Sequence, residues 1–171
     1  MKHLKIALVE ATTDSTHVYS RTYLPRVGIA TMGAILNNMG YACDLWIKPM
    51  SVQEKEQLQQ YDIVGIGSLS NTITNAYQLA DDLKQKNTTV IMGGPHVMFM
   101  PEEALEHCDY VVIWEGDVTL PALITTLEKN KSPEEIPGLA YRLSGKDIHY
   151  TEKASIVDYA NLPSPDFTLS P

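Results

Sequence analysis

The segment VIMGGPHVMFMPEEAL, residues 90–105, contains the succession of features that decides the fold. It begins as a short apolar run typical of a buried strand, breaks at Gly93 and Gly94, and reaches a proline and two glutamates at 101–103 that indicate a helix start. A glycine pair after a strand either supplies a positive φ for a turn or removes side chains so that a flat group can approach the backbone. The residues themselves leave both interpretations open.

Apolar runs typical of strands alternate with amphipathic stretches on both sides of this segment. We expect strands over 4–10, 42–47, 62–69, 88–94 and 109–115, and helices over 26–40, 51–60, 71–86 and 117–130. Such alternation implies right-handed crossovers between parallel strands. The sequence therefore predicts an α/β fold, a flavodoxin-like (Rossmann-like) five-stranded parallel sheet with helices on both faces. Ligands bind sheets of this kind beyond the carboxyl ends of the strands.

The alternation stops after residue 130. Residues 136–152 predict a β-hairpin with its turn at 144–147, and residues 153–171 have the proline-rich composition of a linker that packs little by itself. The expected organisation is thus an α/β domain over 1–135, followed by the hairpin extension and by a linker toward a further domain.

Composition excludes several classes of partner. The chain has 171 residues, a net charge of −8 and a pI of about 5.0, which argues against a nucleic-acid surface. No apolar run approaches the roughly 20 residues that a membrane helix needs. Cys43 and Cys108 belong to no metal-binding pattern and are interpreted as reduced thiols. We therefore expect a cytoplasmic protein with no nucleic-acid or membrane partner.

Hydroxyl-bearing residues follow two of the expected strands. The loop after the first strand is long for a strand-to-helix connection and carries Thr12 and Thr13. Ser68, Ser70 and Asn71 follow the third strand. The last two either hydrogen-bond a ligand or cap the next helix.

Histidines and carboxylates supply the other candidates. His17 and His96 could ligate a metal, but neither has a second ligand at a fixed spacing, so each is more often an ordinary loop residue. Glu115 and Asp117 precede or open a helix, where Asp117 is favoured by the positive end of the helix dipole.

Several familiar sites are excluded by missing residues. Gly67 and Ser68 stand where a receiver domain needs an aspartate, and Gly65 and Gly67 lack the third glycine of a dinucleotide-binding fingerprint. The chain contains no P-loop, and no Ser-His-Asp or Cys-His arrangement follows from spacing. These exclusions favour a binding module over a catalyst.

Six segments in fixed order carry a resemblance over the whole length of the chain. They are LPRVGIATMGAILNNMGY (24–41), YDIVGIGS (61–68), VIMGGPHVMFMPEEAL (90–105), DYVVIWEGDVTLPAL (109–123), IPGLAYR (136–142) and NLPSPDF (161–167). Together they resemble the N-terminal cobalamin-binding domain of class B radical SAM proteins. The resemblance implies a cobalamin (vitamin B12)-binding, and hence metal-ion-binding, module.

The resemblance also implies a set of residues around the cofactor. Gly93 and Gly94 match a glycine pair against which the nucleotide tail of the vitamin packs, and Ser68 matches a serine that meets the same tail. On that basis a leucine at position 94 should abolish cobalamin retention and leave the domain folded. The cofactor-binding residues implied are Thr12, Thr13, Leu24, Pro25, Gly28, Ser68, Leu69, Ser70, Asn71, Gly93, Gly94, Pro95, His96, Glu115 and Gly116.

Two departures from related patterns refine the expectation. The D-x-H-x-x-G motif of histidine-ligated cobalamin proteins is not matched, because Asp14 and His17 have the wrong spacing; bound cobalamin should therefore be base-off with no histidine on cobalt. The C-x-x-x-C-x-x-C iron–sulfur motif is also missing. The chain itself should be non-catalytic, with the cluster and S-adenosylmethionine held by a C-terminal radical SAM domain of the same polypeptide.

Three functions remain open from the sequence. The first is a cobalamin-binding module of a radical SAM enzyme, a methyltransferase or a relative. The second is the same fold without cofactor, used for packing or substrate recognition. The third is a flavodoxin-like binder of another phosphate-bearing ligand such as flavin mononucleotide, favoured by the hydroxyls of residues 11–16 and disfavoured by the absence of glycine from 11–27.

Overall fold

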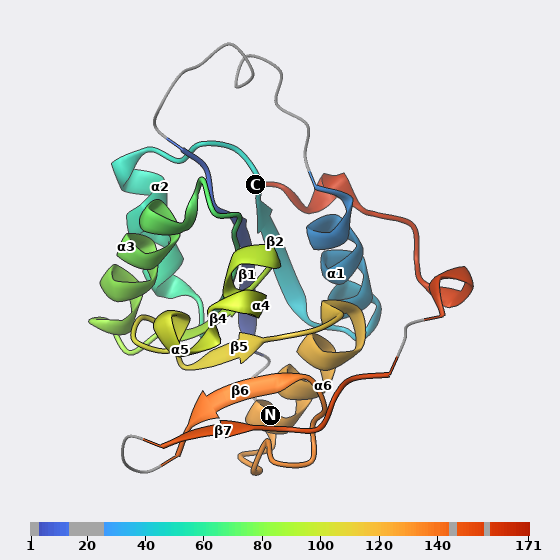
Figure 1. Ribbon diagram of the computed structural model, residues 1–171. Helices are drawn as coiled ribbons and strands as arrows, with labels where there is room; N and C mark the ends of the chain where they lie inside the picture. The colour runs from blue at the N-terminus through green and yellow to red at the C-terminus, as the bar shows by residue number, and fades with distance from the viewer. Residues whose placement is uncertain (1–3, 14–25, 144–146, 156–157) are drawn as a thin grey trace.

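The computed structural model describes residues 4–13, 26–143, 147–155 and 158–171. Within them seven strands form one mixed sheet in the order β2-β1-β3-β4-β5-β6-β7 (Figure 1). The strands are β1 (Lys5–Glu10), β2 (Ala42–Trp46), β3 (Ile63–Gly67), β4 (Thr89–Gly93), β5 (Tyr110–Val112), β6 (Leu139–Arg142) and β7 (Ile148–Tyr150). The helices are α1 (Val27–Asn38), α2 (Val52–Gln57), α3 (Ile73–Lys84), α4 (Pro95–Phe99), α5 (Pro101–Ala104) and α6 (Gly116–Glu128), with 3-10 turns η2 (Leu58–Gln60), η3 (Tyr159–Asn161) and η4 (Phe167–Leu169).

The expected α/β fold is confirmed, but the sheet has seven strands rather than five. Strands β1 to β5 are parallel in the order 2-1-3-4-5, which is the flavodoxin-like order. The hairpin pairs with them instead of standing apart, because β6 runs antiparallel to β5 with Val111 opposite Ala140. A hairpin's sequence indicates its own turn but not the edge it will cover, and here it covers the edge of β5 that would otherwise be unpaired.

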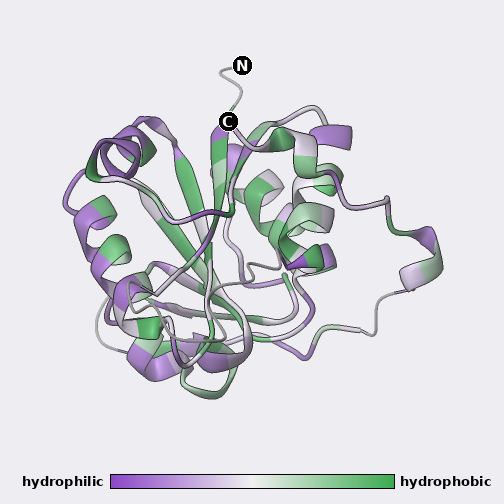
Figure 2. Cartoon of the chain, turned by 90° about the horizontal axis from the view of Figure 1, so that it is seen from above, coloured by the Kyte–Doolittle hydropathy of each residue, from purple (hydrophilic) through white to green (hydrophobic). Residues whose placement is uncertain are grey.

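Two hydrophobic cores lie on the two faces of the sheet. Alternate residues of β4 point to opposite faces, so Val90 and Met92 join the core under α3, α4 and α5, whereas Ile91 joins the core under α1 and α6. Figure 2 shows the strands as mainly hydrophobic and the covering helices as mixed. None of the described helices is long and apolar enough to cross a membrane.

Helix ends follow local chemistry in most places. Ser51 and Glu54 form the reciprocal capping box that starts α2, and Gly40 adopts φ of +88° just beyond α1. The interpretation of Ser70 or Asn71 as the cap of α3 was wrong. The N-cap residue is Thr72, whose hydroxyl accepts from the Leu69 amide and so closes the turn before the helix.

The end of the chain packs more closely than its linker composition indicates. The Asp166 amide donates to the Ala30 carbonyl at 3.3 Å, and Leu169 packs against the core under α1. A methyl group placed on Gly33 would lie only 3.2 Å from Leu169 Cδ1, so the missing side chain in α1 makes room for this leucine. In Figure 1 the red C-terminal segment lies beside α1. One leucine among prolines and polar residues was too weak a signal to predict this docking.

Truncation of Leu169 should measure that docking. We expect Leu169→Ala to lower the free energy of unfolding by about 1–2 kcal/mol, because a partly buried leucine loses its contacts and leaves a small cavity. Phe167→Ala is the matched control: that side chain is 41% exposed, and its removal should cost less than about 0.5 kcal/mol. Urea denaturation followed by circular dichroism gives both values, and equal losses would contradict a docked segment.

Candidate functional site

A cavity opens at the carboxyl ends of the parallel strands, between the sheet and helices α1 and α6. Its volume is about 310 Å³, at the lower end of the roughly 300–1,000 Å³ of small-molecule sites. From β1 the chain first adds β2 on one side of the sheet and then β3 on the other. The cavity lies near this switch in strand order, which is the position at which ligands bind in folds of this kind. The sequence predicted this edge of the sheet, and the structure shows which of its two faces is hollow.

Two rows of residues across β1, β3 and β4 form the sheet side of the cavity. The inner row is Leu8–Gly65–Ile91 and the outer row is Glu10–Gly67–Gly93. Three of these six positions are glycine. The Leu8 side chain fills the space over Gly65, whereas Gly67 and Gly93 leave a trough without side chains in the outer row. A Cβ on Gly67 or Gly93 would meet nothing closer than 3.8 Å, so neither glycine is required by its own packing. Their effect is to keep space open for something else.

Gly94 has a different role from Gly93. Its φ of +104° and ψ of 170° lie in a region that is essentially restricted to glycine. A Cβ there would collide with the carbonyl oxygen of Ser68 and approach the Ser68 nitrogen to 3.0 Å. The turn interpretation of the glycine pair thus holds for Gly94, whereas Gly93 lies beside open space in the cavity lining. The expectation that a leucine at position 94 leaves the domain folded was wrong, because the backbone of the β3–α3 loop occupies that space.

An ion pair stands at the mouth of the cavity. Glu10, at the end of β1, is only 6% exposed, and its carboxylate lies 2.8 Å from Nε of Arg26. The same carboxylate accepts from the Arg26 amide at 3.2 Å, so it also anchors the start of α1. Sequence reasoning missed both residues, although a glutamate ending a buried apolar strand was an available signal.

Two further carboxylates lie across the mouth at the start of α6. Burial raises the pKa of Asp117, and the nearby Glu115 carboxylate raises it further. Asp117 lies in the first turn of α6, as predicted, where the positive end of the helix dipole favours a carboxylate. Trp114 lines the cavity beside them and is 44% exposed. Lys153 Nζ lies over its ring, 4.5 Å from the ring centroid, in a cation–π contact.

The residues implied by the resemblance divide into three groups. Those that line the cavity are Gly28, Gly93, Gly94, Pro95, Glu115 and Gly116. Those that lie outside its lining are Thr12, Thr13, Ser68, Leu69, Ser70, Asn71 and His96. Leu24 and Pro25 lie outside the described residues, as do Asp14 and His17. The apolar wall from the helices was not predicted, because spacing alone does not show which helix face borders a cavity; it consists of Ile29, Met32 and Leu120.

Two of the residues outside the lining have informative surroundings. His96 has Nδ1 3.0 Å from the Ser70 hydroxyl, and its Nε2 lies 3.6 Å from the Glu103 carboxylate without a hydrogen-bond partner among the described residues. Ser68 is fully buried, and its hydroxyl has no hydrogen-bond partner among the described residues. A buried hydroxyl without a partner costs free energy, so a bound group that reached it would gain a hydrogen bond.

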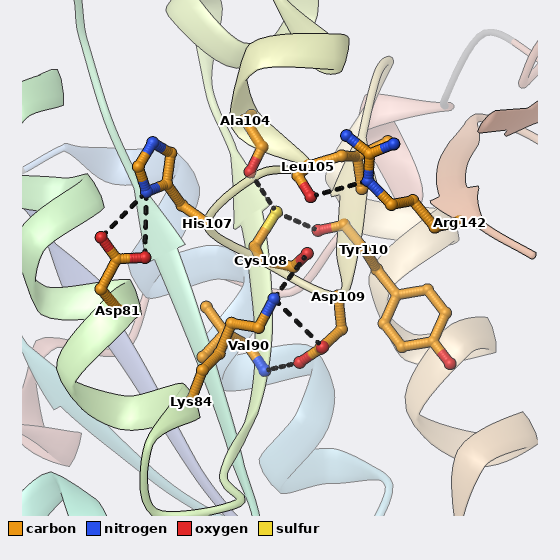
Figure 3. A network of polar contacts seen from close by, with 10 residues as sticks. All are labelled: Asp81, Lys84, Val90, Ala104, Leu105, His107, Cys108, Asp109, Tyr110 and Arg142. Atoms are coloured by element: carbon orange, nitrogen blue, oxygen red, sulfur yellow. Dashed lines mark hydrogen bonds and ion pairs between the residues drawn. The ribbon is translucent and has the colours of Figure 1, made fainter. Parts of the chain in front are cut away.

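A second polar network lies on the other face of the sheet and is structural (Figure 3). His107 contacts both carboxylate oxygens of Asp81 at 3.0 Å, and Lys84 lies 3.8 Å from Asp109. Asp109 also accepts from the Val90 amide at 2.8 Å. These contacts connect α3 and the α5–β5 connection to the start of β4, and none of their residues lines the cavity at the carboxyl edge of the sheet.

The two cysteines are unsuited to metal or redox chemistry. Burial is the main cause that raises the pKa of the Cys43 thiol to about 12, and the same holds for Cys108. The Cys108 thiol donates to the Ala104 carbonyl at 3.1 Å. Among the described residues, no group of three or more His, Cys, Asp or Glu side chains is arranged to hold a metal ion.

A second hollow of about 370 Å³ lies at the opposite edge of the sheet, where β1 and β2 begin. Its lining includes Lys5, Asp44 and Tyr61, and the Tyr61 hydroxyl donates to the Asp44 carboxylate at 2.6 Å. Ligands in this fold bind at the carboxyl ends of the strands and not at their amino ends. The slightly larger volume of the second hollow therefore does not make it the candidate site.

Comparison with protein families decides which ligand the first cavity should be tested against. Residues 18–124 match the model of the B12 binding domain. The chain belongs to the B12-binding domain family. Its match includes β2 to β5, α1 and most of α6, and therefore most of the cavity lining; Leu8 and Glu10 of β1 precede it.

Curated relatives of this B12-binding chain are methyltransferases. An uncharacterized methyltransferase of Pyrococcus horikoshii is 32% identical over 185 residues, covering 100% of this chain and 40% of the relative. Bacteriochlorophyllide d C-8(2)-methyltransferase of Chlorobaculum tepidum is 34% identical over 102 residues, covering 60% of this chain and 21% of that enzyme. The chain thus spans less than half the length of these relatives.

Solved structures share the fold of the B12-binding chain. The cobalamin-dependent S-adenosylmethionine radical enzyme OxsB, with aqua-cobalamin and S-adenosylmethionine bound, superposes with a TM-score of 0.78 at 18% identity, covering 96% of this chain and 24% of that one. The radical S-adenosylmethionine methyltransferase TsrM from Kitasatospora setae gives 0.74 at 14% identity, covering 95% and 31%. At these identities the likeness concerns the fold alone.

Proposed function

We propose that this chain is the cobalamin-binding module of a radical SAM enzyme of the methyltransferase class, and that it is non-catalytic by itself. The observation that carries the proposal is the glycine-floored cavity at the carboxyl edge of the sheet in a member of the B12-binding domain family. The methyltransferase relatives support the choice of reaction class. The iron–sulfur cluster, S-adenosylmethionine and a cytoplasmic location belong to the same proposal.

The residues present fit the flat base of a nucleotide tail. Gly67 and Gly93 leave the sheet side open, and Ile29 and Leu120 face it from α1 and α6. Such a slot excludes water from both faces of an inserted ring and gains from the apolar surface it buries. When bound, cobalamin supplies a cobalt centre that carries methyl groups between a donor and an acceptor. The chain's own contribution is to bind and orient the vitamin.

Reconstitution separates this proposal from its two alternatives. We expect the chain, after incubation with hydroxocobalamin and desalting, to retain about one corrinoid per chain, measured by absorbance and by cobalt content. A cofactor-free packing module would retain none. A phosphate-binding flavodoxin-like module would instead retain flavin mononucleotide; against it, Thr12 and Thr13 lie outside the cavity lining and Arg26 is already paired with Glu10.

The cobalt of bound cobalamin should carry no protein nitrogen. His96 does not line the cavity, and its Nδ1 lies 3.0 Å from the Ser70 hydroxyl. We therefore expect base-off cobalamin, and the electron paramagnetic resonance spectrum of its reduced cobalt(II) form should lack nitrogen superhyperfine splitting. Splitting that disappears in His96→Ala or in His17→Ala would identify a histidine ligand and overturn this prediction.

A further inference from the structure

We infer that the cavity selects corrinoids whose lower base is an apolar benzimidazole over corrinoids whose lower base is a purine. This inference rests on the proposed function and specifies its ligand. The base of a nucleotide tail would lie in the inner part of the cavity. Selection between bases then depends on which polar groups line the inner row and which line the outer row.

The inner part of the cavity offers apolar contacts only. Its sheet side is Leu8–Gly65–Ile91, where the Leu8 side chain lies over Gly65. Val112, level with Gly93 in the outer row, borders this part with an aliphatic side chain; an added Gly93 Cβ would lie 3.9 Å from Val112 Cβ. Ile29 and Leu120 close it from the helices. Apart from the thioether of Met32, the apolar side chains of this lining are aliphatic.

The polar groups of the cavity stand at its mouth or are already engaged. Glu10 belongs to the outer row and is paired with Arg26. Glu115 and Asp117 stand at the start of α6. The backbone of β3 cannot substitute for them, because this strand pairs with β1 on one side and β4 on the other, so its amides and carbonyls are used in the sheet.

The two kinds of base make opposite demands on such a lining. The outer edge of dimethylbenzimidazole carries two methyl groups, which gain free energy when apolar side chains cover them. The corresponding edge of adenine carries an exocyclic amino group and ring nitrogens, and burying these without hydrogen-bond partners is costly. We expect cobalamin to bind roughly ten- to hundredfold tighter than adeninylcobamide, the fold-change that one to two such unpaired groups produce.

Equilibrium dialysis of the chain against cobalamin, adeninylcobamide and cobinamide tests the inference. Cobinamide has the corrin ring but no nucleotide tail, and we expect it to bind more weakly than cobalamin. Equal or tighter binding of adeninylcobamide would overturn base selection and leave the proposed function standing. Failure of all three to bind would overturn the proposed function itself.

A pair of matched variants on β5 tests where the selection arises. Val112→Thr replaces a methyl group by a hydroxyl of similar size on the cavity lining and should narrow the ratio between the two corrinoids severalfold. Val111→Thr makes the same change on the opposite face of the same strand, in the other core, and should leave the ratio unchanged. An unchanged ratio in Val112→Thr, or equal changes in both variants, would show that the base does not occupy this cavity.

Discussion

Replacement of Gly93 by leucine is expected to weaken cobalamin binding at least roughly a hundredfold while the chain stays folded. Gly93 lies in the outer row of the trough, and a Cβ there would meet nothing closer than the Val112 Cβ at 3.9 Å. A leucine therefore fits the backbone but fills the space proposed for the nucleotide tail. Displacing it would require a rearrangement of about 3 kcal/mol, which corresponds to this loss of affinity.

Thr89→Leu is the matched control for this variant. Thr89 begins the same strand on the same face but lies outside the cavity lining, so its replacement should leave cobalamin binding unchanged. Circular dichroism and urea denaturation establish that both variants are folded, and equilibrium dialysis gives their affinities. Wild-type affinity in a folded Gly93→Leu variant would refute the assignment of the tail to this cavity.

The second large effect is on stability. Gly94→Ala should lower the free energy of unfolding by about 2–4 kcal/mol, because alanine is strained at φ of +104° and ψ of 170° and its Cβ would collide with the Ser68 carbonyl. Relief of the collision requires the β3–α3 and β4–α4 connections to separate. The midpoint of urea denaturation measures this loss.

Gly40→Ala separates backbone strain from the collision. Gly40 also has a positive φ, of +88°, but a Cβ there would meet nothing within 4 Å. Its replacement should cost about 1 kcal/mol, the conformational part alone. If the two alanine variants lost equal stability, close packing against Ser68 would not be the reason for glycine at position 94.

The strands and their order were predictable because the signal lies in contiguous residues. A parallel strand covered on both faces must be apolar almost throughout, and β1, β3 and β4 show this directly in the sequence. Alternation with helices then restricts the topology to right-handed crossovers. The same local reasoning failed for the hairpin, because nothing within residues 136–152 specifies that β6 pairs with β5.

The site was predictable as an edge but not as a set of side chains. Gly93 and Glu115 were selected from motifs and do line the cavity, whereas Ser70 and His96 come from equally prominent motifs and contact each other outside its lining. The direction of a side chain in a loop depends on what packs beneath it, and three or four residues of sequence do not contain that information.

The sequence by itself determined the kind of fold, the edge of the sheet that carries the site, and the family resemblance, because each depends on the order and spacing of residues along the chain. Only the tertiary structure decided that Gly93 and Gly94 have separate roles. Gly93 faces a trough shared with Gly67, and Gly94 packs against the backbone of Ser68. The physical reason is that a glycine's role depends on the atoms that a Cβ would meet, and those atoms belong to segments distant in sequence.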